Sequence, residues 1–156
     1  MNTTSYIETL HVGPSAMNLY RSIPDGSGPF PALVVIMNAF GVAEFTKTMC
    51  DRFANEGFLA VAPDLFHTIS DEMVHLEGKT KRELLDDTQI ILDVEATVRS
   101  LQKDPLVQSN KIGITGFCCG GRIAWLMSAV SDAFCASVPF YGGNLFVPWG
   151  TGKLSP

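Results

Sequence analysis

Apolar and polar positions divide the chain into short strand-like and helix-like segments. Near-continuous apolar runs at residues 31–37 and 58–62 are typical of strands that are buried on both faces. The four-residue spacing of Phe45, Met49 and Phe53 predicts a helix that buries these side chains. In chain order we predict strands at 6–12, 17–23, 31–37 and 58–62, a helix at 43–56, a loop at 71–79, a helix at 81–102, a strand at 111–115, a helix at 122–130 and a strand at 135–141. Strands that alternate with helices indicate an α/β fold with a mainly parallel sheet flanked by helices.

Composition places this pattern in one domain over residues 1–156, with 46% apolar and 17% charged residues. The net charge is −5 and lysines and arginines form no stripe, so we expect no nucleic-acid partner. The longest apolar runs are too short to cross a bilayer, so we expect no membrane association. The amino end lacks the features of a signal peptide, which predicts a cytoplasmic protein. The four cysteines are then expected as free thiols, and their spacing predicts no metal site and no other cofactor.

The segment from Gly116 to Gly120 carries the strongest chemical signal. Parallel sheets bind ligands beyond the carboxyl ends of their strands, and this segment follows the strand at 111–115. Its Gly-x-Cys-x-Gly pattern fits a nucleophile elbow, a tight strand-to-helix turn that needs small residues two positions before and after the nucleophile. Cys118 has Gly116 and Gly120 at these positions, whereas Cys119 would have Phe117 before it. We therefore predict Cys118 as the nucleophile and Cys119 as a packing residue.

The same turn predicts the surroundings of the reactive sulfur. A thiol at the amino end of a helix lies at the positive end of the helix dipole, which favours the thiolate. The backbone N–H of Cys119 is a candidate oxyanion donor. A second donor is expected from the loop after the strand at 31–37, where the amides of Ala39 and Phe40 are the candidates.

Other interpretations of the turn stay open. It can be a closely packed turn with an inert buried cysteine. Residues 115–120 also loosely resemble a dinucleotide-binding loop, although Arg122 stands where a small residue is needed and no acidic residue follows the next strand. A redox role for Cys118 and Cys119 is disfavoured, because adjacent cysteines form strained disulfides.

Five segments together resemble the dienelactone hydrolase family. They are residues 31–36, 40–42, 60–66, 113–121 and 140–143, and the Gly-x-Cys-x-Gly-Gly segment is the most specific of them. The resemblance implies an α/β-hydrolase fold and a Cys–His–Asp triad in which Cys118 is the nucleophile. It also implies hydrolysis of a lactone or small ester through a thioester.

Two departures from the family pattern qualify this expectation. Asn38 stands where the family prototype carries a glutamate, and it can hydrogen-bond in the site or satisfy loop backbone groups. The acid and histidine of the fold follow the nucleophile, but no histidine follows Cys118 and the only acid after it is Asp132, expected in a turn. His67 follows the strand at 58–62 and could approach the rim of the site, but a loop role is the favoured interpretation. Asp64 is likewise interpreted as a loop-stabilising carboxylate rather than a catalytic one.

Because the acid and the histidine of the triad are missing after Cys118, we expect a partial domain that lacks the last strands and helices of the α/β-hydrolase fold. The strand at 135–141 would then form an apolar sheet edge, through which we expect self-association. Two functions are then open for the chain. The first is a hydrolase that is acylated at Cys118 but turns over little. The other alternative is a catalytically silent chain that serves as an interaction module.

Overall fold

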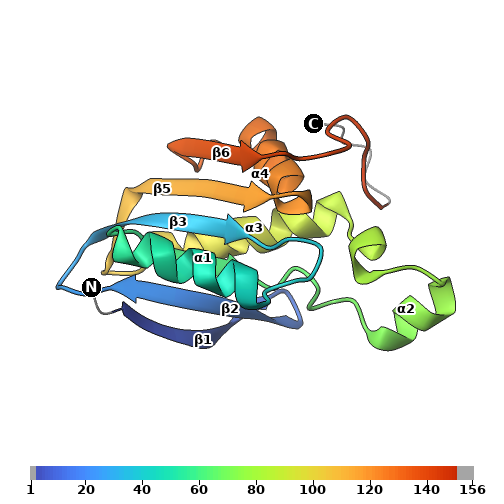
Figure 1. Cartoon of the computed structure of the whole chain (residues 1–156), viewed down its shortest axis with the longest axis horizontal. Helices are drawn as coiled ribbons and strands as arrows, with labels where there is room; N and C mark the ends of the chain where they lie inside the picture. The colour runs from blue at the N-terminus through green and yellow to red at the C-terminus, as the bar shows by residue number, and fades with distance from the viewer. Residues whose placement is uncertain (1–2, 151–156) are drawn as a thin grey trace.

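A computed structural model describes residues 3–150 as a six-stranded sheet flanked by helices (Figure 1). The elements in chain order are β1 (Thr3–Val12), β2 (Ser15–Pro24), β3 (Phe30–Ile36), α1 (Glu44–Asn55), β4 (Leu59–Pro63), α2 (Asp71–Glu77), the 3₁₀ helix η1 (Lys81–Leu84), α3 (Asp87–Gln102), β5 (Val107–Phe117), α4 (Cys119–Val130) and β6 (Ala136–Phe140). The predicted strands are all present, each within a few residues of its expected bounds.

The strand order is β1-β2-β4-β3-β5-β6, which places β6 at one edge of the sheet. The hairpin of β1 and β2 is antiparallel, and β2 also pairs antiparallel with β4. The pairs β3–β4, β3–β5 and β5–β6 are parallel. The prediction of a mainly parallel α/β sheet is therefore confirmed, as is the prediction that the last strand lies at an edge.

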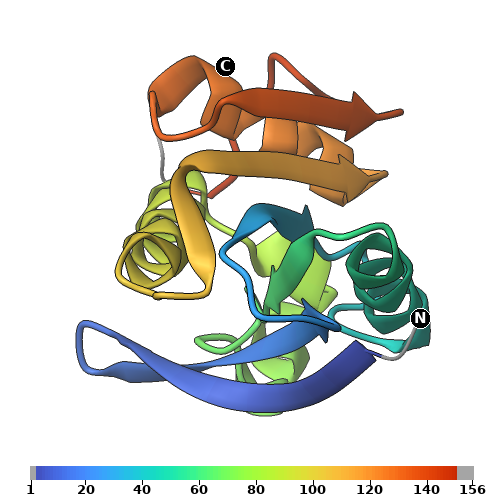
Figure 2. The same cartoon turned by 90° about the vertical axis from the view of Figure 1, so that its left-hand side faces the viewer.

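Helices cover both faces of the sheet, because parallel strands bury apolar side chains on each side. Figure 2 shows α1 on one side and α3 on the other. The larger core cluster joins α3 and α4 to the sheet through side chains such as Val34 and Ile114. A smaller cluster joins α1 to the opposite face through Cys50 and Val35. Val34 and Val35 point to opposite faces because strand side chains alternate.

The prediction that Phe45 is buried on the inner face of α1 is wrong. The buried residues are Thr46, Cys50 and Ala54, whereas Phe45 is 45% exposed. Burial of Thr46 leaves no unsatisfied hydroxyl, because its Oγ1 donates to the carbonyl oxygen of Gly41 at 3.1 Å. Phe45 instead packs edge-on against Phe117, with ring centroids 5.3 Å apart.

The region after β4 also differs from the prediction. The expected loop contains α2, which begins at the capping residue Ser70 and ends at Gly78 in the left-handed conformation. The expected helix at 81–102 is divided into η1 and α3. Asp86 causes the break: its side chain accepts hydrogen bonds from the amides of Thr88 and Gln89, which caps α3. Within residues 3–150, no helix has the length and apolar character needed to span a membrane.

Candidate active site

Cys118 lies at the turn between β5 and α4, at the carboxyl end of the parallel strands. Its backbone has φ of 58° and ψ of −121°, a conformation that residues with a side chain rarely adopt. The thiol of Cys118 is exposed, whereas Cys119 is buried. The turn therefore presents one of the two adjacent sulfurs to solvent, and it is the one that the glycine spacing indicated. Its role as nucleophile stays a prediction.

The glycines on either side of Cys118 are required by close backbone contacts. A Cβ atom at Gly116 would collide with the backbone of Gly120, so the first turn of α4 folds directly over the end of β5. A Cβ at Gly120 would lie 2.6 Å from the carbonyl oxygen of Ile36, below any normal contact distance. These two positions hold the turn against β3, which explains the small-residue pattern in physical terms.

Backbone hydrogen bonds fix Cys118 to its neighbours. Its amide donates to the carbonyl of Phe140 at 3.1 Å, and its carbonyl accepts from the amide of Arg122 at 3.2 Å. The Cys119 sulfur contacts the carbonyl of Met37 at 3.9 Å. Burial raises the pKa of the Cys119 thiol to about 11, so this sulfur stays protonated near neutral pH.

The loop after β3 contains the other expected oxyanion donors. The amide of Phe40 donates to Oδ1 of Asn38 at 2.9 Å, and the amide of Gly41 donates to the Asn38 carbonyl at 3.0 Å. The Asn38 side chain thus satisfies a loop backbone group, and a role for it in the site stays a prediction. The Phe40 amide is engaged in this bond, which makes Ala39 the better candidate donor from this loop.

Aromatic side chains flank the turn that carries Cys118. Phe117 stacks on Phe140 with ring centroids 4.7 Å apart, and Tyr141 lies 6.3 Å from Phe117 in a tilted arrangement. Tyr141 follows β6 with φ of 39°, a second positive value next to the turn. Phe40, on the loop after β3, is 83% exposed. Aromatic side chains of β5 and β6, and of the residue after β6, therefore contact one another at Phe117, the residue before Cys118.

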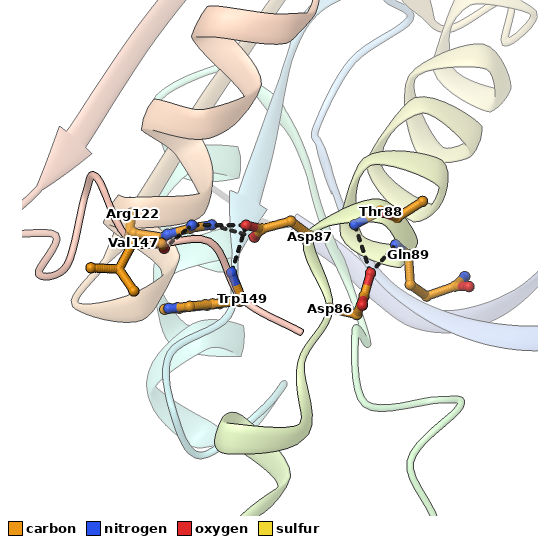
Figure 3. Close-up of polar contacts among 7 residues, drawn as sticks. All are labelled: Asp86, Asp87, Thr88, Gln89, Arg122, Val147 and Trp149. Carbon is orange, nitrogen blue, oxygen red and sulfur yellow. Dashed lines mark hydrogen bonds and ion pairs between the residues drawn. The ribbon is translucent and has the colours of Figure 1, made fainter. Parts of the chain in front are cut away.

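Sequence reasoning missed a buried ion pair next to the turn. Arg122 in the first turn of α4 and Asp87 at the start of α3 are both fully buried, and they form two hydrogen bonds (Figure 3). The same Asp87 carboxylate accepts the amide of Trp149 at 2.8 Å, while Arg122 donates to the carbonyl of Val147 at 2.7 Å. The Trp149 ring lies 4.3 Å from the Arg122 guanidinium. The pair joins α3, α4 and the segment after β6. An arginine within the apolar helix α4 is the sequence signal that could have found it.

The loop after β4 is held by polar contacts of its own. Asp64 accepts the amide of Phe66 at 3.1 Å, which is the loop role expected for it. The side chain of His67 is buried, and its Nε2 lies 3.0 Å from Oδ1 of Asp93 on α3. Burial raises the pKa of the Asp93 carboxyl. His67 is thus tied to α3 through Asp93. Within residues 3–150, no group of three or more His, Cys, Asp or Glu side chains is arranged to hold a metal ion.

Sequence comparison matches residues 17–151 to the model of the dienelactone hydrolase family. A provisionally named carboxymethylenebutenolidase of Methylorubrum extorquens is 36% identical over 130 residues, which cover 79% of this chain and 44% of that protein. A protein of the same provisional name from Yersinia pestis is 34% identical over 142 residues, covering 83% of this chain and 52% of the relative. The chain thus spans about half the length of these curated relatives.

Solved structures agree with the sequence match. A provisionally assigned dienelactone hydrolase from Klebsiella pneumoniae superposes with a TM-score of 0.80 at 26% identity, covering 100% of this chain and 65% of that one. The dienelactone hydrolase from Anabaena variabilis shares the fold with a TM-score of 0.62 at 19% identity, over 83% of this chain and 58% of the other. With the matched family model and the elbow geometry in agreement, the chain belongs to the dienelactone hydrolase family.

Proposed function

We propose that Cys118 attacks the carbonyl carbon of a lactone or small ester. The single observation that carries this proposal is the exposed sulfur of Cys118 at a positive-φ turn between β5 and α4. Family membership supports ester hydrolysis as the reaction class. Cys118 is the N-cap residue of α4, so it lies at the positive end of the helix dipole.

The first chemical step forms a thioester. The thiolate of Cys118 bonds to the carbonyl carbon, and the electron pair of the C=O bond moves to the oxygen. The amide of Cys119, the first residue of α4, and the amide of Ala39 are the proposed donors to that oxygen. The intermediate collapses by breaking the C–O bond to the leaving group, which departs as an alkoxide and takes a proton from water.

The second step, hydrolysis of the thioester, needs a water molecule activated by a base. No histidine follows Cys118 in this sequence, and Asp132 is the only acid that does. Asp132 is exposed in the turn after α4. We therefore propose that this chain alone is acylated once at Cys118 and turns over little.

An activated ester such as p-nitrophenyl acetate tests both the acylation of Cys118 and the low turnover. We expect one equivalent of p-nitrophenol in a rapid phase, followed by a rate close to that of the buffer. Mass spectrometry of the digested product should place the acetyl group on Cys118. Cys118→Ala should abolish the rapid phase, whereas Cys135→Ala should retain it, because Cys135 is an exposed thiol outside the turn.

Two results would contradict the proposal. Acetylation of Cys135 in preference to Cys118 would remove Cys118 as the nucleophile. Sustained hydrolysis that Cys118→Ala abolishes would keep the nucleophile but refute the low turnover, and would require a base among residues that precede Cys118.

A further inference from the structure

Strand β1 forms the edge of the sheet that lies opposite to β6, and it is the longer of the two edge strands. Within residues 3–150 its ten residues pair with β2 alone, and Figures 1 and 2 show it as the outermost strand. In an antiparallel pair, alternate residues direct their N–H and C=O groups to the neighbouring strand and the others direct theirs away from it. About half of the β1 residues therefore present backbone hydrogen-bonding groups on the open side of the sheet.

The sequence of β1 lacks the features with which edge strands avoid pairing. Such strands are protected by lysine, proline, a bulge or a short length. Strand β1 contains no lysine, arginine or proline, and its register with β2 continues without a shift over its whole length. Its one formal charge, Glu8, forms an ion pair with Arg21 of β2 at 3.3 Å. Tyr6 and Ile7, at the centre of the strand, are 43% and 57% exposed. The edge is thus long and regular, with apolar side chains at its centre.

Contacts on both faces of the sheet hold β1 in position. On the α1 face, the hydroxyl of Ser5 donates to the Asp51 carboxylate of α1 at 2.7 Å. On the opposite face, Arg21 donates to Glu8 of β1 and to Asp104, which follows α3. A strand that is already ordered loses less conformational entropy when it binds a partner. Strand β1 is therefore preorganised to accept a further strand.

A second copy of β1 fits this edge better than the other edge strand of the described sheet. Strand β6 has five residues, so it would cover only half of β1. Pairing of β1 with β6 would also leave an open edge on each copy, and such head-to-tail contacts continue into filaments. Two β1 strands are equal in length, and antiparallel pairing about a twofold axis closes the contact after two copies.

Twofold symmetry and charge together select the register of such a pair. Residues with outward-facing backbone groups must meet one another, so the twofold axis passes through a residue rather than between two. An axis at Glu8 would place two carboxylates directly opposite each other, which is unfavourable. An axis at Tyr6 would pair only residues 3–9 of the described strand. An axis at Ile7 pairs residues 3–11 and places Glu8 opposite Tyr6 of the second copy.

We propose that β1 pairs with β1 of a second copy of this chain, antiparallel and centred on Ile7, so that the two sheets become continuous. The contact supplies roughly one backbone hydrogen bond per paired residue. The exposed side chain of Ile7 packs against Ile7 of the second copy. The interface is small, so we expect a dissociation constant on the order of 10 µM. The proposal does not involve Cys118 and is independent of the proposed hydrolysis.

Sedimentation velocity of the Val138→Lys variant tests the proposal, because the added charge opposes pairing at the β6 edge. At about 100 µM, roughly ten times the expected dissociation constant, this variant should sediment as a dimer. Ile7→Lys added to it should weaken dimerisation at least tenfold, since two ammonium groups would meet at the axis. Leu76→Lys is the matched control and should retain the dimer, because Leu76 is 75% exposed on α2 and not on β1.

Disulfide cross-linking tests the register while the β6 edge is unchanged. The Ile7→Cys and Thr4→Cys variants each also carry Cys118→Ala and Cys135→Ala, which remove the exposed native thiols. Mild oxidant should link the Ile7→Cys variant into a covalent dimer, because directly opposite Cα atoms lie about 5 Å apart. The Thr4→Cys variant should stay monomeric in denaturing electrophoresis, because the two copies of position 4 lie about 20 Å apart in this register.

Three results would overturn the proposal. The first is a Val138→Lys variant that is folded by circular dichroism and stays monomeric at about 100 µM. The second is equal dimerisation with and without Ile7→Lys, which would place the contact elsewhere. The third is cross-linking of the Thr4→Cys variant as fast as that of the Ile7→Cys variant, which would refute the register. A failed acylation test at Cys118 leaves these measurements unaffected, so the two proposals fail separately.

Discussion

Gly120 shows how one missing side chain determines the geometry of the turn that carries Cys118. Its Cα faces the carbonyls of Ile36 and Met37, with no room for a methyl group. Gly120→Ala should therefore lower the free energy of unfolding by about 1–3 kcal/mol, the usual effect of overpacking. Urea unfolding measures it. Gly143→Ala is the control, because a Cβ there meets nothing within 4 Å. Equal losses for the two variants would contradict the packing argument.

The adjacent thiols of Cys118 and Cys119 should differ in reactivity. Burial raises the pKa of Cys119 to about 11, so its thiolate appears only as the pH rises towards that value. Iodoacetamide at pH 8 should thus modify the exposed Cys118 and Cys135 and spare Cys119 and Cys50. Mass spectrometry identifies the labelled peptides, and denaturant should expose all four thiols. Modification of native Cys119 as fast as Cys118 at pH 8 would be the contrary result.

At the scale of elements, the Asp87–Arg122 pair connects α3 to α4 beneath the candidate active site. Both side chains are fully buried, so removal of one partner leaves an uncompensated charge. Arg122→Met should lower the free energy of unfolding by about 3–5 kcal/mol. The control is Arg99→Met, which removes an exposed pair with Glu95 and should change stability by less than about 1 kcal/mol. Chemical denaturation compares them, and similar effects would argue against the buried pair.

Sequence patterns predicted the elements whose signals are local. The glycine spacing around Cys118 indicated the turn because the steric requirement involves residues only two positions away. The prediction that Phe45 of α1 is buried was wrong, since a four-residue repeat of apolar residues does not say which side chains face the sheet. Helix α2 was missed because none of its residues is buried, so it has no apolar periodicity to detect. Asp87 and Arg122 are 35 residues apart, and only the tertiary fold brings them together.

At the scale of the whole molecule, β6 forms one edge of the sheet that residues 3–150 build. Edge strands with exposed apolar side chains pair with other chains, and Val138 and Tyr141 are 50% and 74% exposed. We therefore expect self-association that increases with concentration in sedimentation velocity. Phe58→Lys should retain it, because Phe58 precedes β4, which β3 and β5 separate from the β6 edge. A monodisperse monomer at all concentrations would contradict the prediction.

The backbone of Cys118 implies a trade-off between folding and reactivity. At φ of 58° a cysteine carries an energetic penalty that glycine avoids. Cys118→Gly should therefore raise the melting temperature, equivalent to about 1 kcal/mol, while it removes the sulfur. Stability of the folded state alone would favour glycine at position 118. Under the proposed role of Cys118 as nucleophile, the same variant that stabilises the native state would also abolish acylation.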